Sequence, residues 1–206
     1  MYHQMKLRIQ GTGSLLVHNG KVTTNPLNPL TKAIKKISSK RNKVDEDYEA
    51  LAKLEWLGSF YLTEKHQFEV KGNEVIIKKC GLPCMDTDCL EAMLITGAKK
   101  NKLGTQFKSG VLVKETPLLE YEGSRNLEEL WREGTHTDMR KVRIQKNSII
   151  RTRPVFHEWA IAFTVDYLPS LVNPDQIAEA VTKAGTEVGL CDFRPKFGQF
   201  VAMTDS

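Results

Sequence analysis

The stretch HEWAIAFTVDYLPSLVNPDQIAEAVTKAG, residues 157–185, joins the clearest strand pattern of the chain to its clearest helix pattern. Aromatic and β-branched residues fill its first half, and they favour a pleated, half-buried strand. Asn173 suits a helix N-cap, and Pro174 suits the first helical position because its missing N–H is not needed there. Apolar residues recur from Ile177 to Ala184 at helical spacing. The stretch therefore predicts a strand followed by a helix.

Similar patterns lie on both sides of this unit. Residues 5–17 alternate like a strand and are interrupted at Gly11 and Gly13, and residues 88–98 have a helical apolar stripe. Residues 139–156 read as a hairpin turning at Lys146–Asn147–Ser148, and residues 197–204 read as a closing strand. The order β-α-β-β-α-β predicts an α+β fold with a ferredoxin-like or RRM-like core. Since no linker or repeat divides the chain, we expect residues 1–206 to form a single RRM-like domain, with about 21–82 as an insertion.

Positive charge is unevenly distributed along the chain. Its 206 residues carry a formal net charge of +5, and 40% are apolar, which is enough for a sizeable core. No acidic residue occurs between Thr31 and Val44 or between Arg140 and Phe156, although both runs are rich in lysine and arginine. Segregated charge of this kind indicates a polyanionic partner. The alternative for either run is an ordinary solvated face.

A second cationic feature is the stretch VGLCDFRPKFGQFVAM, residues 188–203. Single strands are bound by cations that contact phosphates and by aromatic side chains that stack on bases. Arg194 and Lys196 fit the first role. Phe193, Phe197 and Phe200 fit either base stacking or the core, and for them we favour the core. Gly189 and Gly198 either let the backbone approach a ligand or form a tight turn.

Enzyme signatures are missing from the sequence. We find no G-x-x-x-x-G-K-[ST], G-x-S-x-G or H-E-x-x-H motif, and the five histidines are scattered. Cys80, Cys84 and Cys89 lack the spacing and fourth ligand of a zinc site, so we interpret the cysteines as free thiols and expect no metal and no cofactor. We expect a non-enzymatic protein. The alternative is a metal-independent RNA-processing enzyme that uses His18 as an acid–base catalyst.

Several segments resemble a known family. The C-terminal CDFRPKFGQFVAM resembles the glycine-rich loop of the RAMP superfamily of CRISPR-associated RNA-binding proteins. Residues 38–62, 81–113 and 151–185 are similar to phage proteins distantly related to the backbone subunit of type I CRISPR effector complexes. The resemblance implies an RRM-like palm with inserted subdomains, single-strand binding and copies that stack head-to-tail. It also implies a groove lined by lysines and a β-hairpin thumb, which residues 139–153 would form.

We therefore predict a protein that binds single-stranded RNA or DNA, with RNA slightly favoured, and that assembles head-to-tail along the strand. The alternative is a phage protein-interaction factor that mimics a CRISPR subunit and interferes with host complexes. No signal segment or apolar span is apparent, so we expect a cytoplasmic protein without a membrane partner, in the host cell if it is phage-encoded. The predicted nucleic-acid-binding residues are Lys36, Arg41, Lys99, Lys100, Lys102, Lys108, Arg140, Lys141, Arg143, Arg151, Arg153, Arg194, Lys196 and Phe197.

Overall fold

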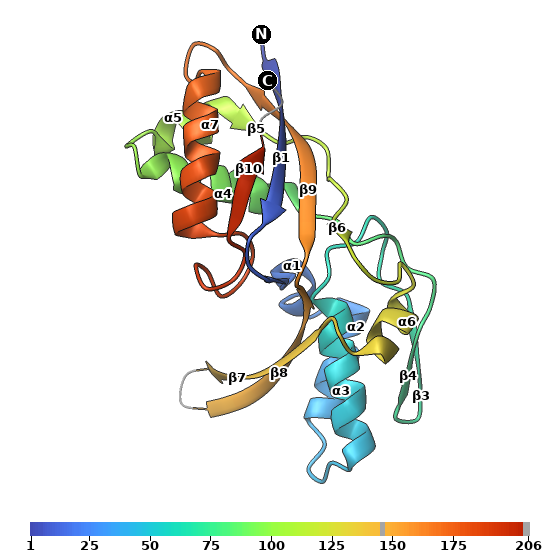
Figure 1. The fold of residues 1–206 in the computed structure, drawn as a ribbon. Helices are drawn as coiled ribbons and strands as arrows, with labels where there is room; N and C mark the ends of the chain where they lie inside the picture. Colours follow the sequence, from blue (N-terminus) through green and yellow to red (C-terminus); the bar gives the residue numbers. More distant parts are fainter. Residues whose placement is uncertain (145–146, 204–206) are drawn as a thin grey trace. The chain divides into compact units, whose positions relative to one another are not determined.

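The computed structural model describes residues 1–144 and 147–203, with the backbone alone at 143, 144, 147 and 148. These residues form an α+β fold with seven α-helices and antiparallel sheets (Figure 1). The chain divides into two compact units: unit 1 is Met1–Leu16, Cys84–Glu122 and Phe156–Ser206, and unit 2 is Val17–Pro83 and Gly123–Val155. Unit 2 contains the predicted insertion, residues 21–82. No helix in the described part of the chain has the length and apolarity needed to cross a membrane.

Unit 1 is built on an antiparallel sheet with the strand order β10-β1-β9-β5, and β6 also pairs with β9. Its strands are β1 (His3–Gly11), β2 (Leu15–Leu16), β5 (Val111–Leu112), β6 (Glu120–Tyr121), β9 (Trp159–Tyr167) and β10 (Phe200–Met203). Its helices are α4 (Thr87–Lys99), α5 (Gly104–Gly110) and α7 (Pro174–Lys183), and a π-helical turn, η1 (Ala184–Val188), continues α7.

The alternation in β1 places one face of this sheet in the core. Leu7 and Ile9 are buried opposite Phe163 and Ile161 of β9, whereas Lys6 and Gln10 are exposed. Such a period-two pattern is expected of a strand that is covered on one face. Helices α4 and α7 pack against each other, and Gly97 permits the close approach, because a Cβ there would lie 2.1 Å from the Ala180 carbonyl oxygen.

The predicted helix starts are close to the observed ones. Asn173 caps α7 as expected, since its side chain accepts the Gln176 N–H at 2.9 Å. For α4 the sequence predicts Thr87 or Asp88 as the cap, and this prediction is wrong by one or two residues. The cap is Asp86, whose carboxylate accepts the Asp88 N–H at 2.9 Å. Several polar residues in succession make such an assignment ambiguous from sequence alone.

Unit 2 is mainly helical with two β-hairpins. Its helices are α1 (Gly20–Thr23), α2 (Pro29–Ser38), α3 (Asp45–Gly58) and α6 (Leu127–Glu133), and its strands are β3 (Phe68–Lys71), β4 (Glu74–Ile77), β7 (Thr137–Ile144) and β8 (Asn147–Phe156, which extends one residue past the unit). Trp56 and Leu57 of α3 are fully buried, and the Trp56 indole N–H donates to the His136 carbonyl at 2.8 Å. The segment FEVKGNEVIIKK, residues 68–79, predicts a hairpin around Gly72–Asn73, and the β3–β4 hairpin confirms it, with a positive φ of 61° at Gly72.

The cationic hairpin consists of β7 and β8, paired antiparallel from Thr137 opposite Pro154 to Ile144 opposite Asn147. The predicted turn at Lys146–Asn147–Ser148 is partly wrong, because Asn147 and Ser148 already belong to β8. Lys146 lies outside the described residues. Strand propensity at the adjoining Ile149 and Ile150 extends the strand through residues that are common in turns.

Candidate nucleic-acid interface

In unit 1 the candidate site is the loop of residues 190–198, which joins η1 to β10. Its neck is closed by backbone hydrogen bonds: the Leu190 N–H donates to the Gly198 carbonyl at 2.9 Å, and the Gly198 N–H donates to the Ser14 carbonyl at 2.8 Å. The Asp192 N–H donates to the Leu16 carbonyl at 3.0 Å, which anchors the loop to the segment after β1. Main-chain hydrogen bonds therefore hold the neck of the loop.

The two glycines serve this neck. Gly189 and Gly198 have φ values of 77° and 74°, a region that residues with a Cβ rarely adopt. A Cβ on Gly198 would lie 2.0 Å from the Leu190 carbonyl oxygen, and one on Gly189 would lie 2.7 Å from the Phe197 carbonyl oxygen. Because the Gly189 N–H donates to the Ala184 carbonyl, the N–H groups of both glycines are used within the protein. The tight-turn interpretation of these glycines is the one that fits the geometry.

The tip of the loop presents the predicted cations. Arg194 and Lys196 are exposed, and within the described residues neither forms an ion pair. Phe193 is 41% exposed, Phe197 is half-buried and Phe200 is buried in the core. Of the three aromatic residues, Phe200 thus fulfils the core expectation, whereas Phe193 offers a ring to solvent beside two unpaired cations.

Four further predicted lysines lie in and after α4 of unit 1. Lys99, Lys102 and Lys108 are exposed, and the Lys99 side chain crosses Gly104, where a Cβ would lie 2.5 Å from its Cγ. Lys100 is also exposed, but its Nζ pairs with the Glu187 carboxylate at 3.0 Å. Glu187 belongs to η1, so Lys100 lies beside the helix that leads into the loop. Glu187 therefore partly offsets the charge of Lys100, whereas Lys99 does not share this ion pair.

In unit 2 two cations of the β7–β8 hairpin have acidic partners. Arg140 forms a two-pronged pair with Asp138, and Arg151 pairs with the buried Glu55 of α3. The Thr152 N–H also donates to Glu55, at 3.1 Å. Burial raises the pKa of Glu55 despite the opposing attraction of Arg151. Arg151 therefore fixes the hairpin to α3, whereas Arg140 pairs with a residue of its own strand, β7.

Glu55 borders a cavity of about 270 Å³ within unit 2. The cavity is lined by His18, Thr23, Thr24, Thr31, Ile34, Glu55, Ser59, Arg151, Thr152 and Arg153. Arg153 is thus placed beside Glu55, whose charge it helps to offset. The candidate catalytic residue His18 lies in the same cavity. A second histidine, which acid–base hydrolysis would use, is not among the lining residues.

The remaining predicted residues of unit 2 are more exposed. Lys36 on α2 and Arg41 after it are both open to solvent, as is Lys141 on β7. The side chain of Arg143 lies outside the described part of the structure. Lys141 stands opposite Ile150, which is 68% exposed, and two residues along β7 from Met139, which is 58% exposed. This face of the hairpin combines one cation with two apolar side chains.

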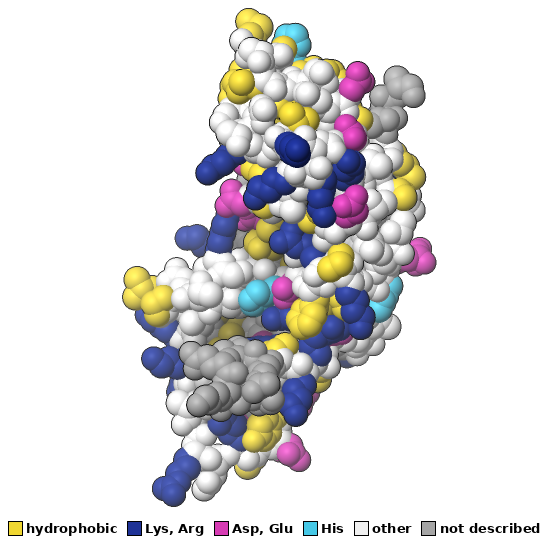
Figure 2. All heavy atoms as spheres, turned by 90° about the vertical axis from the view of Figure 1, so that its left-hand side faces the viewer, with side chains coloured by type: hydrophobic (Ala, Val, Ile, Leu, Met, Phe, Trp, Pro, Cys, Tyr) yellow, Lys and Arg dark blue, Asp and Glu magenta, His cyan; other side chains and the backbone are white. Residues whose placement is uncertain are grey.

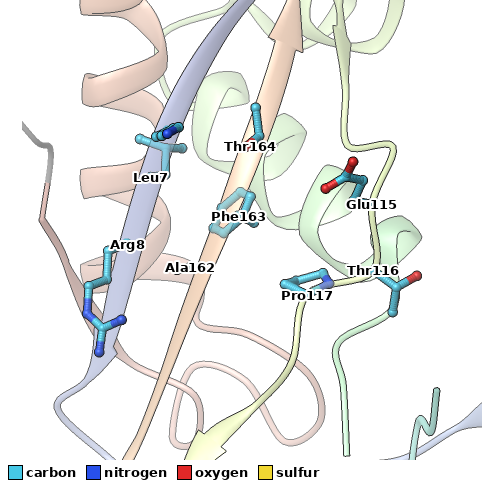
Figure 3. A pocket seen from close by; sticks show the side chains of 9 residues that line it. Leu7, Arg8, Glu115, Thr116, Pro117, Ala162, Phe163 and Thr164 are labelled. Carbon is cyan, nitrogen blue, oxygen red and sulfur yellow. The ribbon is translucent and has the colours of Figure 1, made fainter.

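The sequence analysis missed two cations on the open face of the unit 1 sheet, Lys6 and Arg8. They line a hollow of about 400 Å³ between β1, β9 and residues 115–117 (Figure 3). Arg8 donates to both carboxylate oxygens of Glu120, at 2.6 and 2.7 Å, and thereby lowers the pKa of Glu120. The signal was present, because Lys6 and Arg8 alternate with the core residues of β1. The aromatic residue of β9 that lines the hollow, Phe163, is only 6% exposed, so it offers little surface for base stacking.

All four cysteines are free thiols, and burial raises the pKa of Cys84 to about 11, so this thiol stays protonated at neutral pH. No three His, Cys, Asp or Glu side chains within the described residues cluster closely enough to hold a metal ion.

Figure 2 shows lysine and arginine side chains spread over the face drawn, with acidic side chains among them. A comparison with models of known protein families gives no match, and neither does a search of the curated proteins. The functional argument therefore depends on the geometry of the site itself.

Proposed function

We propose that the protein binds single-stranded nucleic acid without cleaving it, and that RNA is the favoured polymer. The observation that carries the proposal is the loop 190–198. Its neck is closed by main-chain hydrogen bonds, while its tip exposes Arg194, Lys196 and the ring of Phe193. Two cations and an aromatic ring on a backbone-anchored loop are what phosphate contact and base stacking need.

We further propose that unit 1 has a ferredoxin-like core and that the chain is a phage-encoded RAMP-like protein. With β1, β5, β9 and β10 taken as first to fourth strands, the sheet order is fourth, first, third, second, which supports this assignment. Helix α4 follows the first strand, and α7 connects the third strand to the fourth. Head-to-tail assembly along the strand is part of the same proposal.

The test is fluorescence anisotropy with labelled RNA and DNA single strands, titrated with salt. The double variant Arg194→Glu/Lys196→Glu should bind at least about tenfold more weakly. For two single-strand phosphate contacts, the slope of log K against log salt should fall by about 1.4. No binding of either polymer at low salt would refute the proposal.

A matched control separates the loop from net charge. The variant Lys65→Glu/Lys79→Glu replaces two exposed cations outside the predicted set and, like the loop variant, lowers the net charge from +5 to +1. It should bind strands almost as tightly as the wild type. Equal losses in both variants would show that binding follows overall charge and not the loop.

The second candidate function is protein interaction, favoured by one observation. Met139 and Ile150 are 58% and 68% exposed and are diagonal neighbours across β7 and β8. Exposed apolar side chains that lie together are typical of contact surfaces. Retention of a host protein by the wild type but not by Met139→Ser/Ile150→Ser, with no strand binding, would favour this function.

A further inference from the structure

Unit 2 contains an open pocket of about 640 Å³ whose residues the sequence analysis did not single out. It lies between α3, α6 and the start of β7. Its lining residues are Glu49, Lys53, Glu128, Trp131, Arg132, Gly134, Thr137 and Met139. Pockets of this size accommodate small planar ligands when a few polar groups fix their orientation.

Trp131 gives the pocket an aromatic wall. Of the three tryptophans in the chain, Trp56 and Trp159 are buried, whereas Trp131 is half-exposed. Its ring meets that of the buried Trp56 edge-on, with centroids 5.4 Å apart and an interplanar angle of 62°. Trp131 therefore packs on the core residue Trp56, and this contact restricts the ring that lines the pocket. A ring that is already ordered loses little entropy when a ligand stacks on it.

The charges around Trp131 are balanced. Lys53 Nζ pairs with Glu128 Oε1 at 2.5 Å, and Glu128 Oε2 accepts the Ile77 N–H at 2.8 Å. Glu49 and Arg132 add one charge of each sign. Two carboxylates and two cations leave the pocket close to neutral, which suits an uncharged ligand with donor and acceptor groups better than a phosphate.

Thr137 supplies an independent indication of a polar ligand. Its hydroxyl oxygen is buried and has no hydrogen-bond partner within the described residues. A buried polar atom without a partner is costly, and in native proteins it commonly marks a place that water or a ligand occupies. Thr137 lines the same pocket as Trp131. Because its hydroxyl oxygen is buried, one ligand can contact both residues only when the Thr137 side chain rotates toward the pocket.

We propose that this pocket binds one nucleobase of the strand, stacked on Trp131 and hydrogen-bonded at its edge by Thr137. This inference rests on the proposed function, since the strand supplies the base. A nucleobase is uncharged and planar and carries donors and acceptors along its edge, as the pocket requires. The pocket thereby adds a base contact to the phosphate contacts expected of the loop 190–198.

The test compares two single-stranded oligomers of equal length and equal phosphate number, one with bases and one abasic. The base-carrying oligomer should quench tryptophan emission, because Trp131 is the least buried of the three tryptophans, and the abasic one should not. Trp131→Leu keeps an apolar side chain on Trp56 but removes the aromatic ring. It should weaken binding of the base-carrying oligomer by roughly 5- to 150-fold and leave the abasic oligomer unaffected.

Thr137→Val keeps the result interpretable if Trp131→Leu does not fold. Valine is nearly isosteric, and the hydroxyl it removes has no partner in the protein, so folding should be retained or improved. Affinity for the base-carrying oligomer should fall roughly 2- to 10-fold. Salt-sensitive binding of the base-carrying oligomer with unchanged emission, and with an affinity that neither variant lowers, would overturn the pocket while the proposed function stands. Binding of neither oligomer would overturn both.

Discussion

Replacing Gly198 with alanine should open the neck of the loop 190–198. Gly198 has a φ of 74°, and an added Cβ would lie 2.0 Å from the oxygen and 2.6 Å from the nitrogen of Leu190. Both are backbone atoms, so no side-chain rotation relieves the overlap. The Leu190 and Ser14 hydrogen bonds of Gly198, at 2.9 and 2.8 Å, hold the two sides together. Separation of the two sides would break both.

The expected loss follows from these two terms. A left-handed backbone at a residue with a Cβ costs about 1–2 kcal/mol. Loss of two backbone hydrogen bonds adds about 1 kcal/mol each. Gly198→Ala should therefore destabilise unit 1 by about 3–4 kcal/mol. Gly134→Ala is the matched control, because Gly134 also has a φ of 74° but nothing lies within 4 Å of its added Cβ. It should destabilise unit 2 by only about 1–2 kcal/mol.

Amide hydrogen exchange measures both variants, because it reports the stability of each unit separately. In Gly198→Ala, exchange should accelerate most at Leu190, Asp192 and residue 198, whose N–H groups close the loop. Strand affinity should fall with it, since Arg194 and Lys196 would no longer be held in place. The reasoning would be refuted if Gly198→Ala cost no more than Gly134→Ala, or if the neck amides kept their protection.

The remaining predictions concern unit 2. Glu55→Gln removes the carboxylate that pairs with Arg151 and should destabilise unit 2 by about 1–3 kcal/mol, measured by urea denaturation. The double variant Glu55→Gln/Arg151→Met should recover most of that loss, because it leaves no unpaired charge. A double variant as unstable as the single one would contradict the pairing. Burial lowers the pKa of His66, so its proton favours the unfolded chain. The stability that His66 contributes is present above about pH 6.5 and is lost as the pH falls below it. His66→Gln should flatten the dependence of the thermal unfolding midpoint on pH below about 6.5. An unchanged slope of the midpoint against pH would contradict this assignment.

Local patterns predicted the secondary structure well where one periodicity dominated. The strand and helix of residues 157–185 appear as β9 and α7, and Asn173 is the cap. These features depend on contacts within a few residues, which the sequence contains directly. Near Lys146–Asn147–Ser148 and at the start of α4, several residues could serve the same role, and the prediction was shifted. Local preferences of similar strength are decided by tertiary packing.

The predicted cations illustrate the limit for the candidate site. Sequence placed Arg151 and Arg194 in the same class of predicted phosphate contacts, Arg151 from an acid-free basic run and Arg194 from a loop that combines cations with aromatic residues. The structure pairs Arg151 with Glu55, which is 96 positions away in the chain, and leaves Arg194 exposed. Trp131 was overlooked for the same reason, since its ring contact with Trp56 of α3 is made only by folding.

The sequence by itself determined the alternation of strands and helices, the glycine-bounded loop near residue 194 and the excess of positive charge. All of these arise from residue type and from spacing of a few positions. Only the tertiary structure decided which cations have no acidic partner and which aromatic rings are exposed to solvent. It also decided why glycine is required at Gly189 and Gly198. Those properties depend on distances between residues remote in sequence. Ion pairing, burial and steric overlap each act over a few ångströms of space and not along the chain.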